Sequence, residues 1–162
     1  MSRLHRIARI AVLTALSLIL FILEGLLPLP LPVPGAKLGL AAAATLIALY
    51  ALPVRDAGIM LLLRILLASF FGGGPASMLY SLAGGTASFT GMALLKKHTQ
   101  LSVVGISAAG GFLHNMAQLA AAAAVMETTA LFTYAPILGA AGVLTGIAVG
   151  LLTRSVLSKT LR

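Results

Sequence analysis

Apolar residues run along this sequence in six long stretches, separated by residues that end helices or by clusters of charge. Alternating prolines in residues 28–35 follow the first stretch, and residues 72–75 (Gly-Gly-Gly-Pro) follow the third, so neither segment can continue a helix. An apolar stretch of about 20 residues is long enough to cross a membrane as a helix. The pattern therefore predicts six helices, at residues 7–27, 38–52, 57–71, 76–95, 101–126 and 134–157.

Composition assigns these helices to a membrane. Of the 162 residues, 60% are hydrophobic and 9% are charged, whereas an ordinary soluble domain carries about 25% charged residues. Six spans use about 120 residues and leave roughly 40 for loops and ends. We expect a single all-α integral membrane domain over residues 1–162, a six-transmembrane-helix bundle whose short second and third spans are tilted or flanked by protein-covered loops. With no Cys, disulfides and thiolate metal sites are excluded.

Positive charge predicts the orientation of the bundle, because Lys and Arg concentrate on the cytoplasmic side of membrane proteins. With six spans and the N-terminus inside, Lys37 falls in an outer loop and Arg64 lies within a span. The other basic residues all fall inside, so we expect a multi-pass protein of the cell membrane with both termini in the cytoplasm. These residues are Arg3, Arg6, Arg9, Arg55, Lys96, Lys97, Arg154, Lys159 and Arg162.

The same charges argue against several function classes. The net charge of +8 would suggest nucleic acid in a soluble protein, but here the bases flank apolar stretches and no basic stripe is interleaved with aromatic residues. The Walker pattern is absent, so the chain is not itself an ATPase. One Asp and two Glu leave few general acids or metal ligands. A Ser-His-Asp set would need Asp56, at the end of a helix far from His114 in the middle of another. We expect no catalysis, metal or cofactor.

Arg64 is the most informative polar residue, because it lies in the middle of an apolar stretch. A charge at the centre of a span costs about 2.5–3.5 kcal/mol on insertion scales, so such a residue usually faces a cavity or pairs with a partner. Glu24, one turn from the end of the first span, is a candidate partner. Two interpretations stay open, a binding site that contains both residues and a structural Arg64–Glu24 ion pair.

The fifth span contains three strong polar residues, His114, Asn115 and Gln118, at spacings that place them on one helix face. Hydrogen bonding between helices would explain them, but three such groups in an otherwise Ala-rich helix favour a lined cavity. A metal site is not expected, because His114 lacks a second His or carboxylate at ligand spacing. Lys37 and Tyr80 are weaker candidates for the outer part of the same site.

Four segments together resemble a known family: Leu29–Ala41 (LPLPVPGAKLGLA), Leu62–Leu67 (LLRILL), Leu79–Gly85 (LYSLAGG) and His114–Gln118 (HNMAQ). They look like the membrane family known both as Gx transporter and as heptaprenyl diphosphate synthase component I. That family is in turn similar to the substrate-binding S-components of energy-coupling factor (ECF) transporters. The resemblance implies a six-helix protein that docks on a transmembrane T-component and cytoplasmic ATPases. It also implies that Ala11 and Ala15 serve this docking, as an Ala-x-x-x-Ala pattern does in S-components.

The two family names predict different functions. The first is a substrate-binding subunit of an ECF-type transporter, which captures a small anionic or amphipathic molecule from outside. The alternative is a non-catalytic membrane subunit of heptaprenyl diphosphate synthesis, because a catalytic synthase of the known kind would need two Asp-rich motifs and this chain has one Asp. A structural partner of a membrane redox complex is a further alternative. We favour the first of these, with Arg64, His114, Asn115 and Gln118 as the binding residues.

Overall fold

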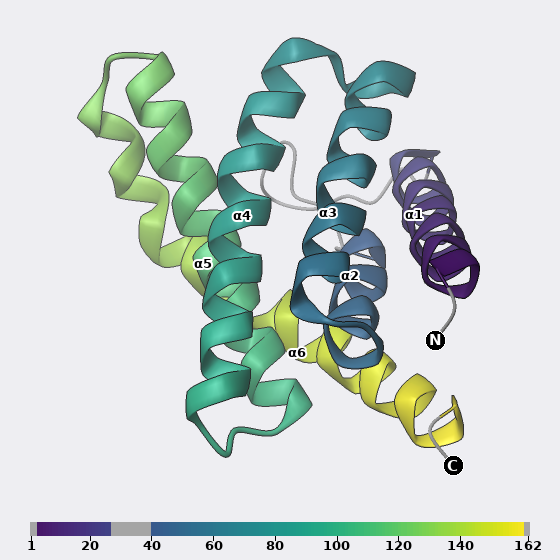
Figure 1. Ribbon diagram of the computed structural model, residues 1–162. Helices are drawn as coiled ribbons and strands as arrows, with labels where there is room; N and C mark the ends of the chain where they lie inside the picture. The colour runs from purple at the N-terminus through teal and green to yellow at the C-terminus, as the bar shows by residue number, and fades with distance from the viewer. Residues whose placement is uncertain (1–2, 27–39, 161–162) are drawn as a thin grey trace.

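The computed structural model describes residues 3–26 and 40–160, which form six α-helices, one turn of π-helix and a short 3-10 helix (Figure 1). No strand occurs in these two ranges, so the all-helical prediction is confirmed. The helices are α1 (Arg3–Leu26), α2 (Leu40–Ala51), α3 (Val54–Ala68), α4 (Gly74–His98), α5 (Val103–Val125) and α6 (Ala135–Thr160), with the π-helix η1 (Ser69–Gly73) before α4 and the 3-10 helix η2 (Thr129–Tyr134) before α6.

Each predicted stretch contains one helix, but several ends were predicted wrongly. Helix α1 begins at Arg3, four residues before the predicted start, because Arg and Leu favour a helix even where the apolar pattern has not begun. The helix predicted at residues 57–71 lies closer to the N-terminus in the structure. Helix α3 begins directly after Pro53 and ends where η1 begins, at Ser69. An apolar pattern marks the part of a helix that lies in lipid, not the residues where its hydrogen bonding starts and stops.

Three of the described helical segments are long and apolar enough to cross a membrane by length and composition: Arg3–Glu24, Gly74–His98 and Thr129–Lys159. Helix α2 has 12 residues and α3 has 15. At 1.5 Å per residue they are about 18 and 22 Å long, shorter than the roughly 30 Å hydrocarbon layer. The structure therefore supports a membrane protein, while a bundle of six complete spans stays a prediction.

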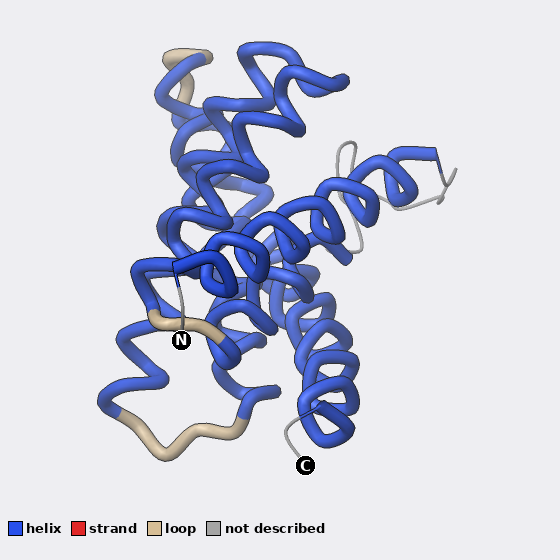
Figure 2. Tube along the Cα trace, turned by 45° about the vertical axis from the view of Figure 1, so that its right-hand side comes forward, coloured by secondary structure: helices blue, strands red, loops and turns tan. Residues whose placement is uncertain are grey.

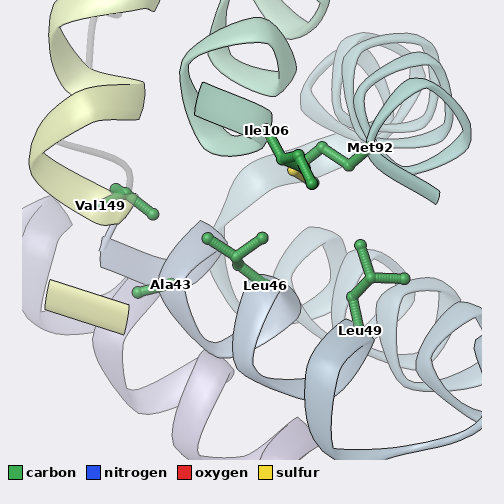
Figure 3. Packing of buried hydrophobic residues seen from close by; sticks show 6 residues of the cluster. All are labelled: Ala43, Leu46, Leu49, Met92, Ile106 and Val149. Atoms are coloured by element: carbon green, nitrogen blue, oxygen red, sulfur yellow. The ribbon is translucent and has the colours of Figure 1, made fainter. Parts of the chain in front are cut away.

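Helix α2 lies at the centre of the molecule, between two sets of neighbouring helices. One face places Leu46 and Leu49 against residues of α4, α5 and α6 (Figure 3). The opposite face places Ala44 and Ala48 against α1 and α3. All four side chains are at most 1% exposed. Protein therefore covers α2 on both of these faces.

The six helices form two groups of three. In the first group α1 packs on α2 and α3, and in the second α4 and α6 both pack on α5. The main contacts between the groups are α2 with α6 and α3 with α4. The connections after α3 and after α5 lie at one end of the molecule. The start of α1, the α2–α3 turn, the α4–α5 loop and the end of α6 lie toward the other (Figures 1 and 2).

Glycines bring α5 and α6 into backbone contact. A Cβ added to Gly111 would lie 2.0 Å from the carbonyl oxygen of Gly142, and one added to Gly142 would lie 2.5 Å from that of Gly111. One turn further along α6, a Cβ on Gly146 would lie 2.5 Å from the carbonyl oxygen of Ser107. No larger residue fits these positions unless the two backbones move apart, so small residues hold this helix pair together.

A partly buried ion pair joins α1 to α3. The guanidinium of Arg6 donates two hydrogen bonds to the carboxylate of Asp56, the one from Nε being 2.7 Å long. Asp56 is 1% exposed and Arg6 is 47% exposed. The sequence assigned Arg6 only to membrane orientation and offered no partner for Asp56. The pair fixes the start of α1 beside the start of α3.

Removing Arg6 is expected to destabilise the protein strongly, because Asp56 would remain buried without a cation. We expect Arg6→Gln to lower the midpoint of thermal unfolding in detergent several times more than Arg3→Gln, its exposed neighbour one helical turn away. Circular dichroism at 222 nm measures both. The reversed pair, Arg6→Asp with Asp56→Arg, should recover part of the loss. Equal effects of Arg6→Gln and Arg3→Gln would contradict a structural role for the pair.

Candidate functional site

A cavity of about 620 Å³ lies between the two groups of helices, and residues from all six α-helices line it. This volume is within the range of about 300–1,000 Å³ typical of small-molecule sites. Tyr80 and Met92 both line the cavity and lie about 18 Å apart along α4 at 1.5 Å per residue. The cavity is therefore elongated along α4.

Its two ends differ in polarity. Toward the connection between α3 and α4, the lining includes Arg64, Tyr80 and Ser81. Toward the α2–α3 turn it includes Leu46, Met92 and Val149, which belong to the buried cluster of Figure 3. An elongated cavity with one polar and one apolar end suits an amphipathic molecule.

Arg64 enters the cavity from α3 without a hydrogen-bonding partner in the described part of the chain. Its Nε atom is buried and unbonded. The carboxylate of Glu24, on α1, is close enough for its charge to act on the guanidinium, but no hydrogen bond joins the two side chains in residues 3–26 and 40–160. Glu24 is 5% exposed and has a further interaction of its own. A buried N–H donor without an acceptor is costly, so the Nε atom of Arg64 favours an incoming hydrogen-bond acceptor.

His114 and Gln118 pack against a glycine of α4. A Cβ on Gly84 would lie 2.7 Å from Cγ of Gln118 and 3.0 Å from Nε2 of His114. The backbone of Gly84 lies beside the His114 ring, and the charge of Arg64 acts on the ring. The Gly84-Gly85 pair thus lets α4 approach α5 closely enough to position two polar side chains at the cavity.

Asn115 joins helices as well as lining the cavity. Its Nδ2 atom donates a 2.8 Å hydrogen bond to the carbonyl oxygen of Leu138 on α6. For Asn115, this contact supports hydrogen bonding between helices, one of the two explanations that the sequence offers for the polar residues of this face. Asn115 also lines the cavity, and its Oδ1 atom is not used in the bond to Leu138.

Six of the residues that the sequence singled out for binding line this one cavity: Glu24, Arg64, Tyr80, His114, Asn115 and Gln118. Lys37 lies outside the described residues. Ala11 and Ala15 are exposed on α1 and away from the cavity. Their docking role stays a prediction, as does ligand binding by the six.

The sequence missed the small hydroxyl residues of the wall, Thr45, Ser88, Ser107 and Thr145. Their only signal was a small polar side chain within an apolar stretch, which is common in helices that merely pack together. In the part of the chain that the structure describes, no group of three His, Asp or Glu residues could hold a metal ion.

Fold and cavity together define an all-helical membrane protein with an internal, ligand-sized site. The family described as heptaprenyl diphosphate synthase component I has a sequence model that matches residues 13–156, and the chain belongs to that family. No curated protein and no solved structure matches the chain. The similarity to ECF S-components stays a resemblance of sequence segments.

Proposed function

We propose that this chain is the membrane-embedded, non-catalytic subunit of a polyprenyl diphosphate synthase, and that it binds a small amphipathic molecule in its central cavity. The family description supports this function, because a component I implies at least one further component. The proposal differs from the transporter interpretation that the sequence favoured, which has no support from the family match.

The non-catalytic role is supported by one observation: the single aspartate of the chain is already bound to an arginine. Prenyl transfer of the known kind needs clustered carboxylates to hold Mg²⁺ and diphosphate. Asp56 is the only Asp in the chain, and its carboxylate is occupied by Arg6 on the first turn of α3. Because it lies away from the cavity lining, the carboxylates for catalysis must come from another subunit.

We further propose six spans with both termini in the cytoplasm. The contact between Arg6 and Asp56 requires α1 and α3 to start at the same end of the molecule, as two intervening crossings would give. The start of α1, the α4–α5 loop and the end of α6 also lie toward one end (Figures 1 and 2). Basic residues gather in these segments, which supports placing that end in the cytoplasm.

A second candidate function is substrate capture for transport, as in an S-component. The cavity favours it, because a bundle that only anchored a soluble enzyme would not need a ligand-sized site lined by an arginine within a span. Under this function the partners would be a membrane T-component and ATPases with Walker motifs, not a synthase subunit.

Co-purification from native membranes, followed by reconstitution, tests the proposed function. We expect a soluble subunit with Asp-rich motifs to co-purify in mild detergent. Liposomes holding this chain alone should not extend an allylic diphosphate with radiolabelled isopentenyl diphosphate. The soluble subunit should form long polyprenyl products faster on these liposomes than on empty ones.

Two outcomes would contradict the proposal. Product formation that is the same with empty liposomes would remove the accessory role. Co-purification of Walker-motif ATPases and a T-component, together with ATP-dependent uptake of a cavity ligand, would establish the transport function in its place.

A further inference from the structure

The apolar end of the cavity, toward the α2–α3 turn, is bounded by buried side chains from both groups of helices. Three of these side chains line the cavity, Leu46, Met92 and Val149. Leu49 and Ile106 are buried beyond them, at 0% and 1% exposure. With Ala43 they form one cluster, called here the apolar plug: Ala43, Leu46 and Leu49 from the first group, and Met92, Ile106 and Val149 from the second (Figure 3). Because both groups contribute to it, the plug opens when the groups move apart at this end.

Lys96 joins the two groups beside the plug. Its Nζ atom, in the last turn of α4, donates a 2.6 Å hydrogen bond to the carbonyl oxygen of Leu49 in α2. In a continuing helix residue 53 would donate to this oxygen, but Pro53 has no N–H, so the carbonyl is left for Lys96. The ammonium also lies 4.5 Å from the centroid of the Tyr50 ring, within the range of cation–π attraction.

Each group has internal contacts that let it move as one body. In the first group Arg6 binds Asp56 across α1 and α3, and in the second group glycines bring α5 and α6 into backbone contact. Because α1–α3 precede α4–α6 in the sequence, the chain passes between the groups once, through η1 and Gly74. Gly74 has φ +67° and ψ 177°, a backbone conformation open essentially only to glycine. It lies at the opposite end of α4 from Lys96, in the kind of position between elements where hinges occur.

We propose that the plug end of the cavity is a gate: the two groups separate at the apolar plug while pivoting on η1 and Gly74, and Lys96 holds the gate closed. Opening connects the cavity to the end of the molecule where the α2–α3 turn and the α4–α5 loop lie (Figures 1 and 2). Calling this the cytoplasmic end, where a soluble subunit meets the ligand, rests on the proposed function. The movement itself does not depend on it.

Lys96 is the contact that makes opening costly. In a membrane, apolar side chains that separate are met by lipid tails or by the apolar part of a ligand, which are as apolar as the side chains themselves. Parting the plug therefore loses packing but gains no hydrophobic penalty. Parting Lys96 from Leu49 leaves a carbonyl oxygen without its donor and takes the ammonium away from Tyr50. A hydrogen bond from a charged donor corresponds to about 10- to 100-fold in an equilibrium constant, so Lys96 lowers the open population by about that factor.

The reaction of introduced cysteines with a water-soluble maleimide tests the gate, on the full chain in nanodiscs without ligand or partner. The chain has no Cys, so each single cysteine variant reports on one position. Ile106→Cys lies in the plug. Ile65→Cys lies at the same boundary between the groups but near the pivot, where the side chain of Ile65 meets Gly85 of α4. Both isoleucines are 1% exposed, so both thiols react only when the structure opens around them.

Three substitutions are compared in each cysteine background. Lys96→Met removes the ammonium and keeps an unbranched side chain, so we expect it to raise the reaction rate of Ile106→Cys about 10- to 100-fold and to leave that of Ile65→Cys nearly unchanged. Lys97→Met, at the exposed neighbouring lysine, should change neither rate. Lys96→Arg keeps a cationic donor that also stacks on aromatic rings, so it should keep the rate of Ile106→Cys close to that with Lys96 intact.

Two results would overturn the gate. An unchanged rate for Ile106→Cys in the Lys96→Met variant would show that Lys96 does not hold the plug closed. Equal increases for Ile106→Cys and Ile65→Cys would show a general loss of structure in place of a movement about η1. Neither a synthase subunit nor a ligand takes part in these measurements, so the gate can fail while the proposed function stands. Conversely, native membranes from which no synthase subunit co-purifies would contradict the proposed function and leave the gate in place.

Discussion

Gly111→Ala is expected to separate α5 from α6 and to cost the protein a large part of its stability. The added methyl group would lie 2.0 Å from the carbonyl oxygen of Gly142, a backbone atom that cannot rotate away. Overpacked cores usually lose about 1–3 kcal/mol and occasionally more, and we expect this variant at or above the upper end. Against a total stability of about 5–15 kcal/mol, the loss should appear as a large fall in the thermal midpoint. Circular dichroism and size-exclusion chromatography in detergent measure it.

Gly105→Ala provides a matched control on the same helix. The nearest atoms to its added Cβ would be 3.6 Å away, at Ser102 and Leu101, which is ordinary contact. Because Ala favours a helix over Gly by up to about 1 kcal/mol, this variant should be neutral or slightly stabilised. Gly142→Ala, which meets the backbone of Gly111 at 2.5 Å, should resemble Gly111→Ala. Similar midpoints for Gly105→Ala and Gly111→Ala would contradict the close packing of this helix pair.

Much of the fold was predictable because apolar stretches and helix-ending residues are local signals. The Gly and Pro positions separated the same six helices that the structure contains. Helix ends were less predictable. The turn after α3 continues as π-helix through Ser69–Gly73 before α4 begins, so the glycines there lie within helical turns. The central position of α2 was not predictable either, since its burial depends on helices that are distant in sequence.

The cavity was predictable in part, because some of its lining residues also give local signals in the sequence. His114 and Gln118 share a face by local spacing, and Arg64 stands out because a charge within an apolar stretch needs an explanation. The partner of Asp56 could not be found, because Arg6 is 50 residues away and looked like one of several basic residues before the first span. The bond of Asn115 to a backbone carbonyl of α6 leaves no trace in sequence, since every residue carries such an acceptor.

The stability of the empty protein offers an independent test of the role of Arg64. We expect Arg64→Met to stabilise the ligand-free protein by about 1–4 kcal/mol, as seen when buried charges are replaced by apolar side chains of similar volume. The Nε atom of Arg64 is buried and has no hydrogen-bonding partner in the described residues, so methionine removes a desolvation cost without removing a bond. Chemical unfolding in mixed micelles measures the change. Arg55→Met, at an exposed position, should change stability by less than about 0.5 kcal/mol.

A loss of stability in Arg64→Met would instead identify a structural Arg64–Glu24 ion pair. In that case Glu24→Gln should cause a similar loss, and the double variant should lose little more than either single one, because the pair would already be broken. If Arg64 is held for a ligand, the double variant should keep the gain seen in Arg64→Met. Such a gain in stability is what a site that sacrifices stability for function would show.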